Sequence, residues 1–466
     1  MSTIFTEANV YPVTGRLIDA FTEIVERFPD RPAVIHNGRA MTYAQLDAEV
    51  RRAARNLGPR PGVVAVPTSR TPDTIASLFA IWAAGGAYCP IDPAFPEERQ
   101  KAMREAAGCD EASNSDDIAY ILFTSGSTGD PKPVLTPRRA IDATIPSLRT
   151  LFEISPHDRM LQFASLNWDT SFEEILPTLT GGAALVFDDE AYTGSFPRLM
   201  RMVERERITV LDLPTAFWHE LVYYLTEEDA ALPDCLRLMV IGGEAANPAR
   251  VADWCALDTA HVRLVNTYGC TETTLITHAI DLHGPRAMPG LTLERIPIGR
   301  ALPHVREYVS EDGELVIGGP PVALGYKGLP EATKARFVEV DGEMRFSTGD
   351  RVSAGPHGVL FHEGRIDNEV KIRGIRVDPA EVEAHIAAHP AVSAVAVTAM
   401  VQAGRTVLAA FVVRRDETTS SDILEFLRAR VPQHLVPSRL SIVPQLVYTT
   451  SGKVDRAKSK ESFNEH

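Results

Sequence analysis

The chain has 466 residues, of which 44% are hydrophobic and 23% charged, which is the composition of an ordinary globular protein. Its formal net charge of -15, with no long run of lysine or arginine, argues against nucleic acid and anionic membranes as partners. Five cysteines without a CxxC pair favour a reducing compartment over a disulfide framework. The first residues, MSTIFTEANVYPV, carry no secretory signal, so we expect a cytoplasmic protein.

Alternating strand and helix patterns run through residues 62–243. Within them, residues 74–91 contain no charged side chain and approach the length of a membrane span. Gly85, Gly86 and Pro90 interrupt this stretch, so it is predicted to be a buried helix followed by a buried strand. The alternation predicts an α/β protein with mostly parallel sheets covered by helices, in which ligands bind where strands end in loops.

From about Glu294 the pattern changes to short strands bounded by glycines, which predicts antiparallel pairing. A helix is expected after these strands, with Asp378 as its N-cap, Pro379 at its first position and Glu381 at the capping-box spacing. The remaining strands and helices predict a small α+β unit at the C-terminal end.

The segment LFTSGSTGDPKPV at residues 122–134 combines glycines, hydroxyls and a lysine, the materials of a phosphate-binding loop. A Walker loop needs a glycine directly before its lysine and a helix directly after it, whereas Pro131 and Pro133 flank Lys132 here. The segment is therefore predicted to be a mobile flap between two strands that holds phosphate. A flexible surface linker is the alternative.

Four later segments accompany this loop: VNTYGCTETT at 265–274, FSTGD at 346–350, EGRIDNEVKIRGIRVDPAEVE at 363–383 and TTSGKVDR at 449–456. Each is a weak motif alone, but in this order they resemble the adenylate-forming superfamily, most closely the adenylation domains of nonribosomal peptide synthesis. The resemblance runs from about residue 41 to Arg456. It implies a large N-terminal domain over residues 1–366, with a β-barrel-like part, and a small mobile domain over residues 367–466 that swings about Asp367.

The resemblance also implies a reaction and a set of site residues. A carboxylate attacks ATP in the presence of Mg²⁺ to give an acyl-adenylate and pyrophosphate, and a thiol then takes the acyl group. The implied catalytic residues are Lys132, Thr271, Glu272 and Lys453, with Glu272 as the magnesium ligand. The implied ATP-binding residues are Thr124, Ser125, Gly126, Ser127, Thr128, Gly129, Gly243, Glu244, Asn266, Tyr268, Asp350 and Arg365. Gly374 is implied to line the approach of the thiol.

The segment FASLNWDTSFEEIL at 163–176 resembles the family's substrate-binding segment. Asp169 matches the acid that pairs with a substrate amino group, which favours an amino acid over an aryl or fatty acid. The implied pocket residues are Asp169, Thr170, Glu173, Asp212, Met239, Ile241, Thr267, Leu275 and Ile276. Because an unpaired carboxylate is costly in a pocket, Glu173 and Asp212 suggest a diamino acid such as β-lysine, lysine, ornithine or 2,3-diaminopropionate. Alternatively, one acid faces an internal arginine or solvent.

Some features depart from the family pattern. The segment between residues 99 and 118 is short, so a strand and its loop are expected to be missing, and Cys270 and Pro133 replace a usual proline and glycine. No carrier motif follows Arg456, so we expect a free-standing enzyme that loads the phosphopantetheine thiol of a separate carrier protein in antibiotic or other natural-product biosynthesis. The alternatives are activation of a small neutral amino acid, an acyl-CoA ligase of the same fold, and an inactive binding relative.

Overall fold

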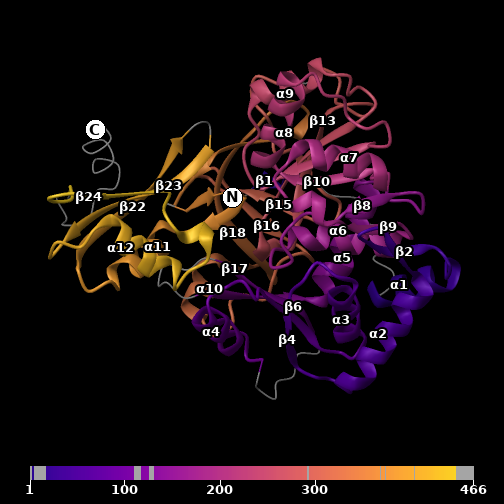
Figure 1. Ribbon diagram of the computed structural model, residues 1–466, viewed down its shortest axis with the longest axis horizontal. Helices are drawn as coiled ribbons and strands as arrows, with labels where there is room; N and C mark the ends of the chain where they lie inside the picture. Colours follow the sequence, from indigo (N-terminus) through magenta and orange to yellow (C-terminus); the bar gives the residue numbers. More distant parts are fainter. Residues whose placement is uncertain are drawn as a thin grey trace. The chain divides into compact units, whose positions relative to one another are not determined.

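The structure is a computed structural model that describes residues 3–4, 17–109, 117–124, 131–290, 293–367, 369–372, 374–402 and 405–447. Its residues form two compact units (Figure 1). The first unit comprises Met1–Asp92, Ala107–Leu122 and Val134–Ile366, and the second Pro93–Ala106, Phe123–Pro133 and Asp367–His466. The mixed α/β architecture, with a large and a smaller unit, confirms the predicted fold class. Two segments of the second unit, Pro93–Ala106 and Phe123–Pro133, belong to the large domain of residues 1–366 in the division expected from the sequence.

The largest sheet of the first unit has the strand order β14-β13-β12-β11-β10-β8-β9-β2-β3. Its strands are β2 (Pro32–His36), β3 (Arg39–Thr42), β8 (Arg159–Leu161), β9 (Ala184–Phe187), β10 (Val210–Pro214), β11 (Leu238–Gly242), β12 (Arg263–Gly269), β13 (Ile276–His283) and β14 (Arg300–Ala301). The strands from β2 to β12 along this order run parallel, and β3, β13 and β14 add antiparallel edges.

The described helices lie between and beyond these strands along the chain. They are α1 (Leu17–Arg27), α2 (Tyr43–Leu57), α3 (Pro72–Ala83), α4 (Glu97–Ala107), α5 (Arg138–Leu151), α6 (Thr170–Gly181), α7 (Phe196–Glu206), α8 (Thr215–Glu227), α9 (Pro248–Ala256), α10 (Pro330–Arg336), α11 (Pro379–Ala387) and α12 (Ser420–Arg428), with short 3-10 turns at Asp189–Tyr192, Thr271–Thr273, Pro356–Gly358 and Gln433–Leu435. Their alternation with parallel strands is the predicted βα pattern.

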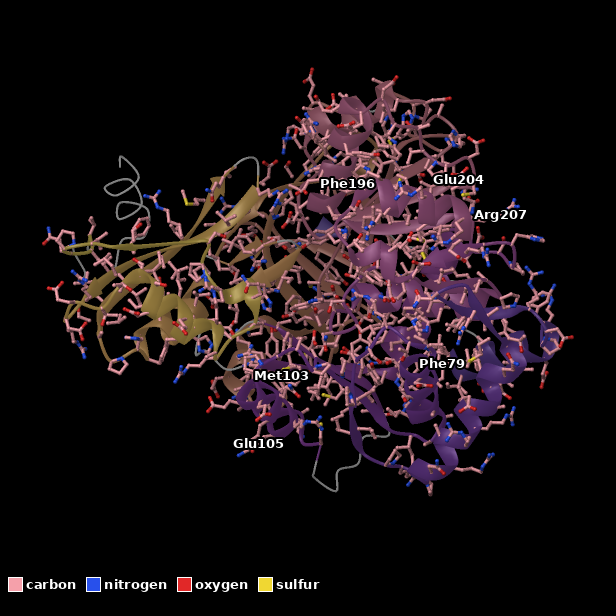
Figure 2. All side chains as sticks on the ribbon, viewed as in Figure 1. Phe79, Met103, Glu105, Phe196, Glu204 and Arg207 are labelled. Carbon is pink, nitrogen blue, oxygen red and sulfur yellow. The ribbon has the colours of Figure 1, made fainter. Side chains whose placement is uncertain are left out.

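The large sheet separates two hydrophobic cores because successive strand residues face opposite sides. On one side Val240 of β11 packs in the same core as Phe172 of α6. On the other side Met239 and Ile241 pack with Trp218 of α8. The helix α7 contributes its apolar side to this second core and exposes Glu204 and Arg207 (Figure 2). The site described below lies on the α6 side.

The first unit contains two further sheets. One of them also includes residues at both ends of the segment Phe123–Pro133, which is grouped with the second unit. One sheet has the order β4-β5-β6-β7, with β4 at Val63–Pro67, β5 at Ala87–Ile91, β6 at Ile118–Thr124 and β7 at Lys132–Pro137, and in it β4, β5 and β6 run parallel. An antiparallel sheet joins β1 (Thr3–Ile4), β15 (Arg306–Val309), β16 (Glu314–Gly318), β17 (Phe337–Val340), β18 (Glu343–Ala354) and β19 (Leu360–Arg365). The uncharged stretch 74–91 is a buried helix and a buried strand, as predicted, and no helix in the described ranges is long and apolar enough to cross a membrane.

The second unit contains the hairpins β20 (Val370–Ile372) with β21 (Ile375–Val377) and β22 (Val392–Gln402) with β23 (Arg405–Arg414), and β24 (Arg439–Ile442) runs parallel to β23. The side chain of Asp378 caps α11 by accepting from the backbone N–H of Ala380 at 2.9 Å, and Pro379 follows it, so the predicted helix start is confirmed. Glu381, in the first turn of α11, forms an ion pair with Arg99 of α4 at 3.2 Å. This pair joins α4 to the C-terminal part of the unit.

Candidate active site

The candidate site gathers at the carboxyl ends of β10, β11 and β12, beside the N-terminus of α6. A tight turn at residues 269–276 closes it, and there a Cβ added to Gly269 would lie 1.8 Å from the carbonyl oxygen of Leu275. Thr274 and Leu275 both have left-handed backbone conformations, with φ of 55° and 67°. Such conformations are costly for residues with side chains and concentrate at functional sites. The turn thereby presents Thr271 and Glu272 to the site.

Asp350, the predicted ribose-binding acid, is buried on β18 and accepts three hydrogen bonds. The Tyr268 hydroxyl donates to Oδ2 at 2.6 Å, and Arg365 Nη1 donates to Oδ1 at 3.2 Å. His362 Nε2 lies 3.0 Å from Oδ1 as well. β18 and β19 pair directly, with Asp350 opposite Arg365, so this arrangement follows from the strand register. The structure therefore brings Tyr268, Asp350 and Arg365 together as the motifs predicted, and it adds His362.

Asn266 of β12 is buried close to this cluster. Its Nδ2 donates to the backbone oxygen of Pro297 at 2.8 Å, whereas its Oδ1 has no donor among the described residues. A buried acceptor without a donor is costly, so this oxygen fits an N–H group brought by a ligand. The exocyclic amine of adenine is such a group.

Glu272, the predicted metal ligand, is almost completely buried in the turn after β12. Its Oε1 accepts a hydrogen bond from the Tyr326 hydroxyl at 2.8 Å. The Tyr326 hydroxyl thus fixes the orientation of this carboxylate. Mg²⁺ commonly takes one or two protein carboxylates and completes its shell with water and substrate phosphates, so this single acid fits it.

Asp169 immediately precedes α6, but its carboxylate does not cap the helix. The pKa of Asp169 is raised to about 6, chiefly by burial, with a hydrogen bond from Thr271 acting to lower it and the nearby charge of Glu272 acting to raise it. The side chain is nevertheless partly exposed, which leaves it accessible to a ligand. A carboxylate with this environment favours a cationic partner such as an ammonium group.

Glu173 of α6 and Asp212 of β10 lie in hydrogen-bonding contact and are both buried. Burial, followed by the charge of Asp212, raises the pKa of Glu173 well above its ordinary value, and burial raises the pKa of Asp212 to about 7. No described Lys, Arg or His forms an ion pair with either acid. The structure thus brings together two of the residues that the sequence analysis assigned to the substrate pocket.

Two predicted pocket residues need correction. In the parallel register Asp212 lies opposite Val240, and Leu211 and Leu213 lie opposite Met239 and Ile241. Met239 and Ile241 therefore face away from Asp212, into the α8 core. The residues of β11 on the Asp212 side are Val240 and Gly242. The sequence-based assignment was wrong by one position, while Thr267 reaches this strand from β12 and donates to the carbonyl of Ile241 at 3.0 Å.

Glu174 is a buried acid that sequence reasoning missed. Its carboxylate accepts from Gln162 Nε2 at 2.8 Å and from the backbone N–H groups of Phe163 and Ala164 at 2.8 and 2.9 Å. It therefore fixes the loop after β8 to α6, directly beside Glu173. The doublet of acids in the sequence was its only signal.

The remaining predicted residues are distributed as follows. Thr124 ends β6 and Lys132 begins β7, so a strand follows the loop lysine, and the next helix starts only at Arg138. Gly243 and Glu244 follow β11, and Thr170 opens α6. Leu275 and Ile276 are buried in the α6-side core. Asp367 and Gly374 lie in the second unit. Ser125, Gly126, Ser127, Thr128, Gly129 and Lys453 lie outside the described residues.

A buried polar cluster lies behind Tyr268. The ring of His278 meets the Tyr268 ring edge-on, with 5.7 Å between centroids, and its Nε2 lies 2.8 Å from Glu307 Oε2. His304 is buried next to His278, and neither of its ring nitrogens has a hydrogen-bond partner among the described residues. Burial, followed by the proximity of His278, lowers the pKa of His304 to about 3.

We expect His304 to make the fold sensitive to acid. Its pKa is depressed in the folded state, so only the unfolded chain takes up this proton between about pH 6.5 and pH 3, and unfolding becomes easier as the pH falls through that window. The loss should reach about 2 kcal/mol at pH 5. His304→Phe is expected to flatten the dependence of the unfolding midpoint on pH. An unchanged slope in denaturant titrations between pH 5 and 8 would contradict this assignment.

Comparisons with known proteins agree with this geometry. The chain matches the AMP-binding enzyme family over residues 21–112 and 109–327, and the AMP-binding enzyme C-terminal domain over residues 381–453. It is 38% identical over 472 residues to the isonitrile lipopeptide synthase of Streptomyces coeruleorubidus, covering 91% of this chain and 32% of the relative. It is 32% identical to tyrocidine synthase 3 of Brevibacillus parabrevis, covering 97% of this chain and 8% of the relative. The chain thus spans a third or less of these relatives.

Solved structures share the fold. An artificially fused adenylation-PCP di-domain, NpsA-ThdA from Klebsiella oxytoca, superposes with a TM-score of 0.80 and 26% identity, covering 91% of this chain and 93% of that one. The amide bond synthetase McbA from Marinactinospora thermotolerans superposes with a TM-score of 0.83 and 23% identity, covering 96% and 100%. The chain belongs to the AMP-binding enzyme family. The comparisons confirm the resemblance predicted from the motifs and support an adenylating ligase.

Proposed function

We propose that this protein adenylates an amino acid that carries a second amino group, and then transfers the aminoacyl group to the phosphopantetheine thiol of a separate carrier protein. The observation that carries the proposal is the group of three acids, Asp169, Glu173 and Asp212, beside the nucleotide residues. No cationic side chain of the described residues pairs with any of the three. Two ammonium groups on one substrate match this charge pattern.

The nucleotide fits the other side of the site. Asp350, held by Arg365 and His362, supplies acceptor oxygens for the ribose hydroxyls. Asn266 Oδ1, which has no donor among the described residues, would accept a hydrogen bond from an N–H group of the base. Glu272 is the residue that would hold Mg²⁺, which supplies positive charge to the triphosphate when bound. Thr271 lies within reach of both Asp169 and the neighbouring Glu272, so it sits where substrate and phosphate meet.

The first step joins two anions, so positive charge is needed at the reacting groups. The substrate carboxylate attacks the α-phosphorus of ATP, and pyrophosphate leaves. We assign Lys132 to the departing pyrophosphate and Lys453 to the substrate carboxylate and α-phosphate. Asp367 and Gly374 are assigned to the domain rotation that admits the thiol, with residues 367–466 as the moving domain. In the second step the thiol displaces AMP from the aminoacyl-adenylate.

The acceptor and the biosynthetic setting are supported by the relatives. One matched solved structure combines adenylation and PCP parts, and two of the similar relatives are named isonitrile lipopeptide synthase and tyrocidine synthase 3. An acyl-CoA ligase would not require Asp169 or the Glu173–Asp212 pair. A small neutral amino acid is the second candidate, because two acids that share one proton can line a pocket without a cation.

Pyrophosphate exchange tests the proposal directly. We expect lysine, ornithine, β-lysine or 2,3-diaminopropionate to drive faster exchange than norleucine, norvaline or alanine. Glu173→Gln should reduce this preference by about tenfold or more, because one lost charge contact of about 1.4 kcal/mol corresponds to that factor. Exchange with small neutral amino acids alone would contradict the diamino assignment, and exchange with no amino acid would favour an inactive relative.

A further inference from the structure

The Glu173–Asp212 pair is positioned by two rigid elements. Glu173 lies in the first turn of α6, and Asp212 lies in the middle of β10 on the sheet face that α6 covers. Their side chains are only 7% and 3% exposed, so water does not separate or screen the two carboxyl groups. Asp212 Oδ2 is fully buried and has no hydrogen-bond partner among the described residues. One acceptor atom of the pair therefore has no donor among the described residues.

The groups that face this pair are acids or neutral. Asp169 and Glu174 are two further acids at the same end of α6 as Glu173, and burial raises the pKa of Glu174 well above its ordinary value. From β6, the buried Tyr120 lies close to Asp169 and Glu173, and burial raises the pKa of its hydroxyl well above the ordinary value, so it stays neutral. The described surroundings thus offer the pair no compensating positive charge.

Two carboxylates in dry contact cannot both be ionised without a cation. One proton placed between them turns the repulsion into a hydrogen bond, as in other carboxylate dyads. The shifts are consistent with this, because burial and Asp212 raise the pKa of Glu173 well above normal while the pKa of Asp212 lies at about 7. The two carboxyl groups therefore exchange protons as one unit.

We propose that the empty pocket holds one proton shared by Glu173 and Asp212, and that the side-chain ammonium of the substrate replaces this proton when it binds. The inference rests on the proposed function and specifies how the same pocket selects its substrate. The substrate brings its own charge, and the displaced proton leaves to solvent, so the charge of the filled pocket stays equal to that of the empty one. A substrate without the second amino group leaves the proton in place.

Calorimetry detects the exchange without catalysis. Lysine and norleucine, which lacks only the side-chain ammonium, are titrated into the full chain at pH 6.5 in two buffers of different ionisation enthalpy. Ornithine with norvaline, and 2,3-diaminopropionate with alanine, serve as further matched pairs. We expect each bound diamino acid to release close to one proton more than its neutral partner. Any contribution from Asp169 is shared by both members of a pair and cancels.

The outcomes separate this inference from the proposed function. Equal proton release by a diamino acid and its neutral partner would overturn the exchange, and preference for the diamino acid in pyrophosphate exchange would still support the proposed substrate class. If no diamino acid binds, both proposals fail. At pH values below the pKa of the pair, the affinity for lysine should increase about tenfold for each unit by which the pH is raised, because binding releases one proton. The affinity for norleucine should not show this dependence.

Two variants test which groups hold the proton. Asp212→Asn and Glu173→Gln each remove one acid with little change in volume, so the difference in proton release within each matched pair should disappear. Glu190→Gln, an exposed acid on the Asp189–Tyr192 turn, serves as the control and should retain the full difference. A retained difference in both pocket variants would assign the proton to another group and overturn the inference.

Discussion

Replacing Asp169 with asparagine is expected to lower kcat/KM for the amino acid by about thirty-fold to several thousand-fold, the effect of about 2–5 kcal/mol that follows from removing one partner of a buried charge pair. The carboxylate does not cap α6, and the expected defect therefore comes from the lost ammonium partner, not from a damaged helix. Pyrophosphate exchange at varied amino-acid concentration measures it.

The same residue predicts a pH dependence. Because the pKa of Asp169 is raised to about 6, its charge is lost as the pH falls through that value, and kcat/KM of the wild-type protein should fall with it. Asp169→Asn should lose this limb of the profile. Asp253→Asn, at a half-buried acid paired with Arg250, is the matched control and should behave as the wild type. An Asp169→Asn variant with undiminished kcat/KM would remove this acid from the substrate site.

Replacing Glu381 with glutamine is expected to destabilise the second unit by about 3–5 kcal/mol, the usual result of removing one partner of a buried ion pair. The side chains of Arg99 and Glu381 are 11% and 0% exposed, so the guanidinium would lose this charged contact away from bulk water. Hydrogen exchange of α4 and α11 should report the loss as faster exchange in both helices.

A double variant provides the control for this effect. Arg99→Met combined with Glu381→Met removes both charges and keeps similar side-chain volume, so it should recover most of the lost protection. Exposed pairs such as Arg51 with Asp47 should give less than about 1 kcal/mol when broken. If Glu381→Gln leaves exchange in α4 unchanged, the ion pair does not hold this helix in the unit.

Much of the architecture was predictable because local patterns determined it. The alternation of apolar strands and helices indicated parallel sheets, and the glycine-bounded strands after residue 294 indicated the antiparallel ones. Asp378 and Pro379 specified a helix start by their own chemistry, and the structure shows that start. In each case the signal lies within a few neighbouring residues.

The errors arose where the decisive information is not local. The sequence Leu238–Gly242 is apolar at every position, so it contains no alternation that distinguishes the two sheet faces, and only pairing with β10 shows that Val240 is on the pocket side. His362 becomes a partner of Asp350 through the β18–β19 register. The grouping of α4 with the C-terminal residues likewise depends on a contact between residues almost three hundred positions apart.

The close approach of β11 and β12 at the pocket has a consequence for how such a pocket changes in evolution. A Cβ placed on Gly242 would lie 2.4 Å from Thr267 Oγ1, so a side chain at position 242 requires Thr267 to move or to be replaced by a smaller residue. The side chains at positions 242 and 267 therefore share one limited volume. Relatives with a side chain at the position of Gly242 should carry a smaller residue at the position of Thr267, and a change of substrate size at this wall requires two coordinated substitutions.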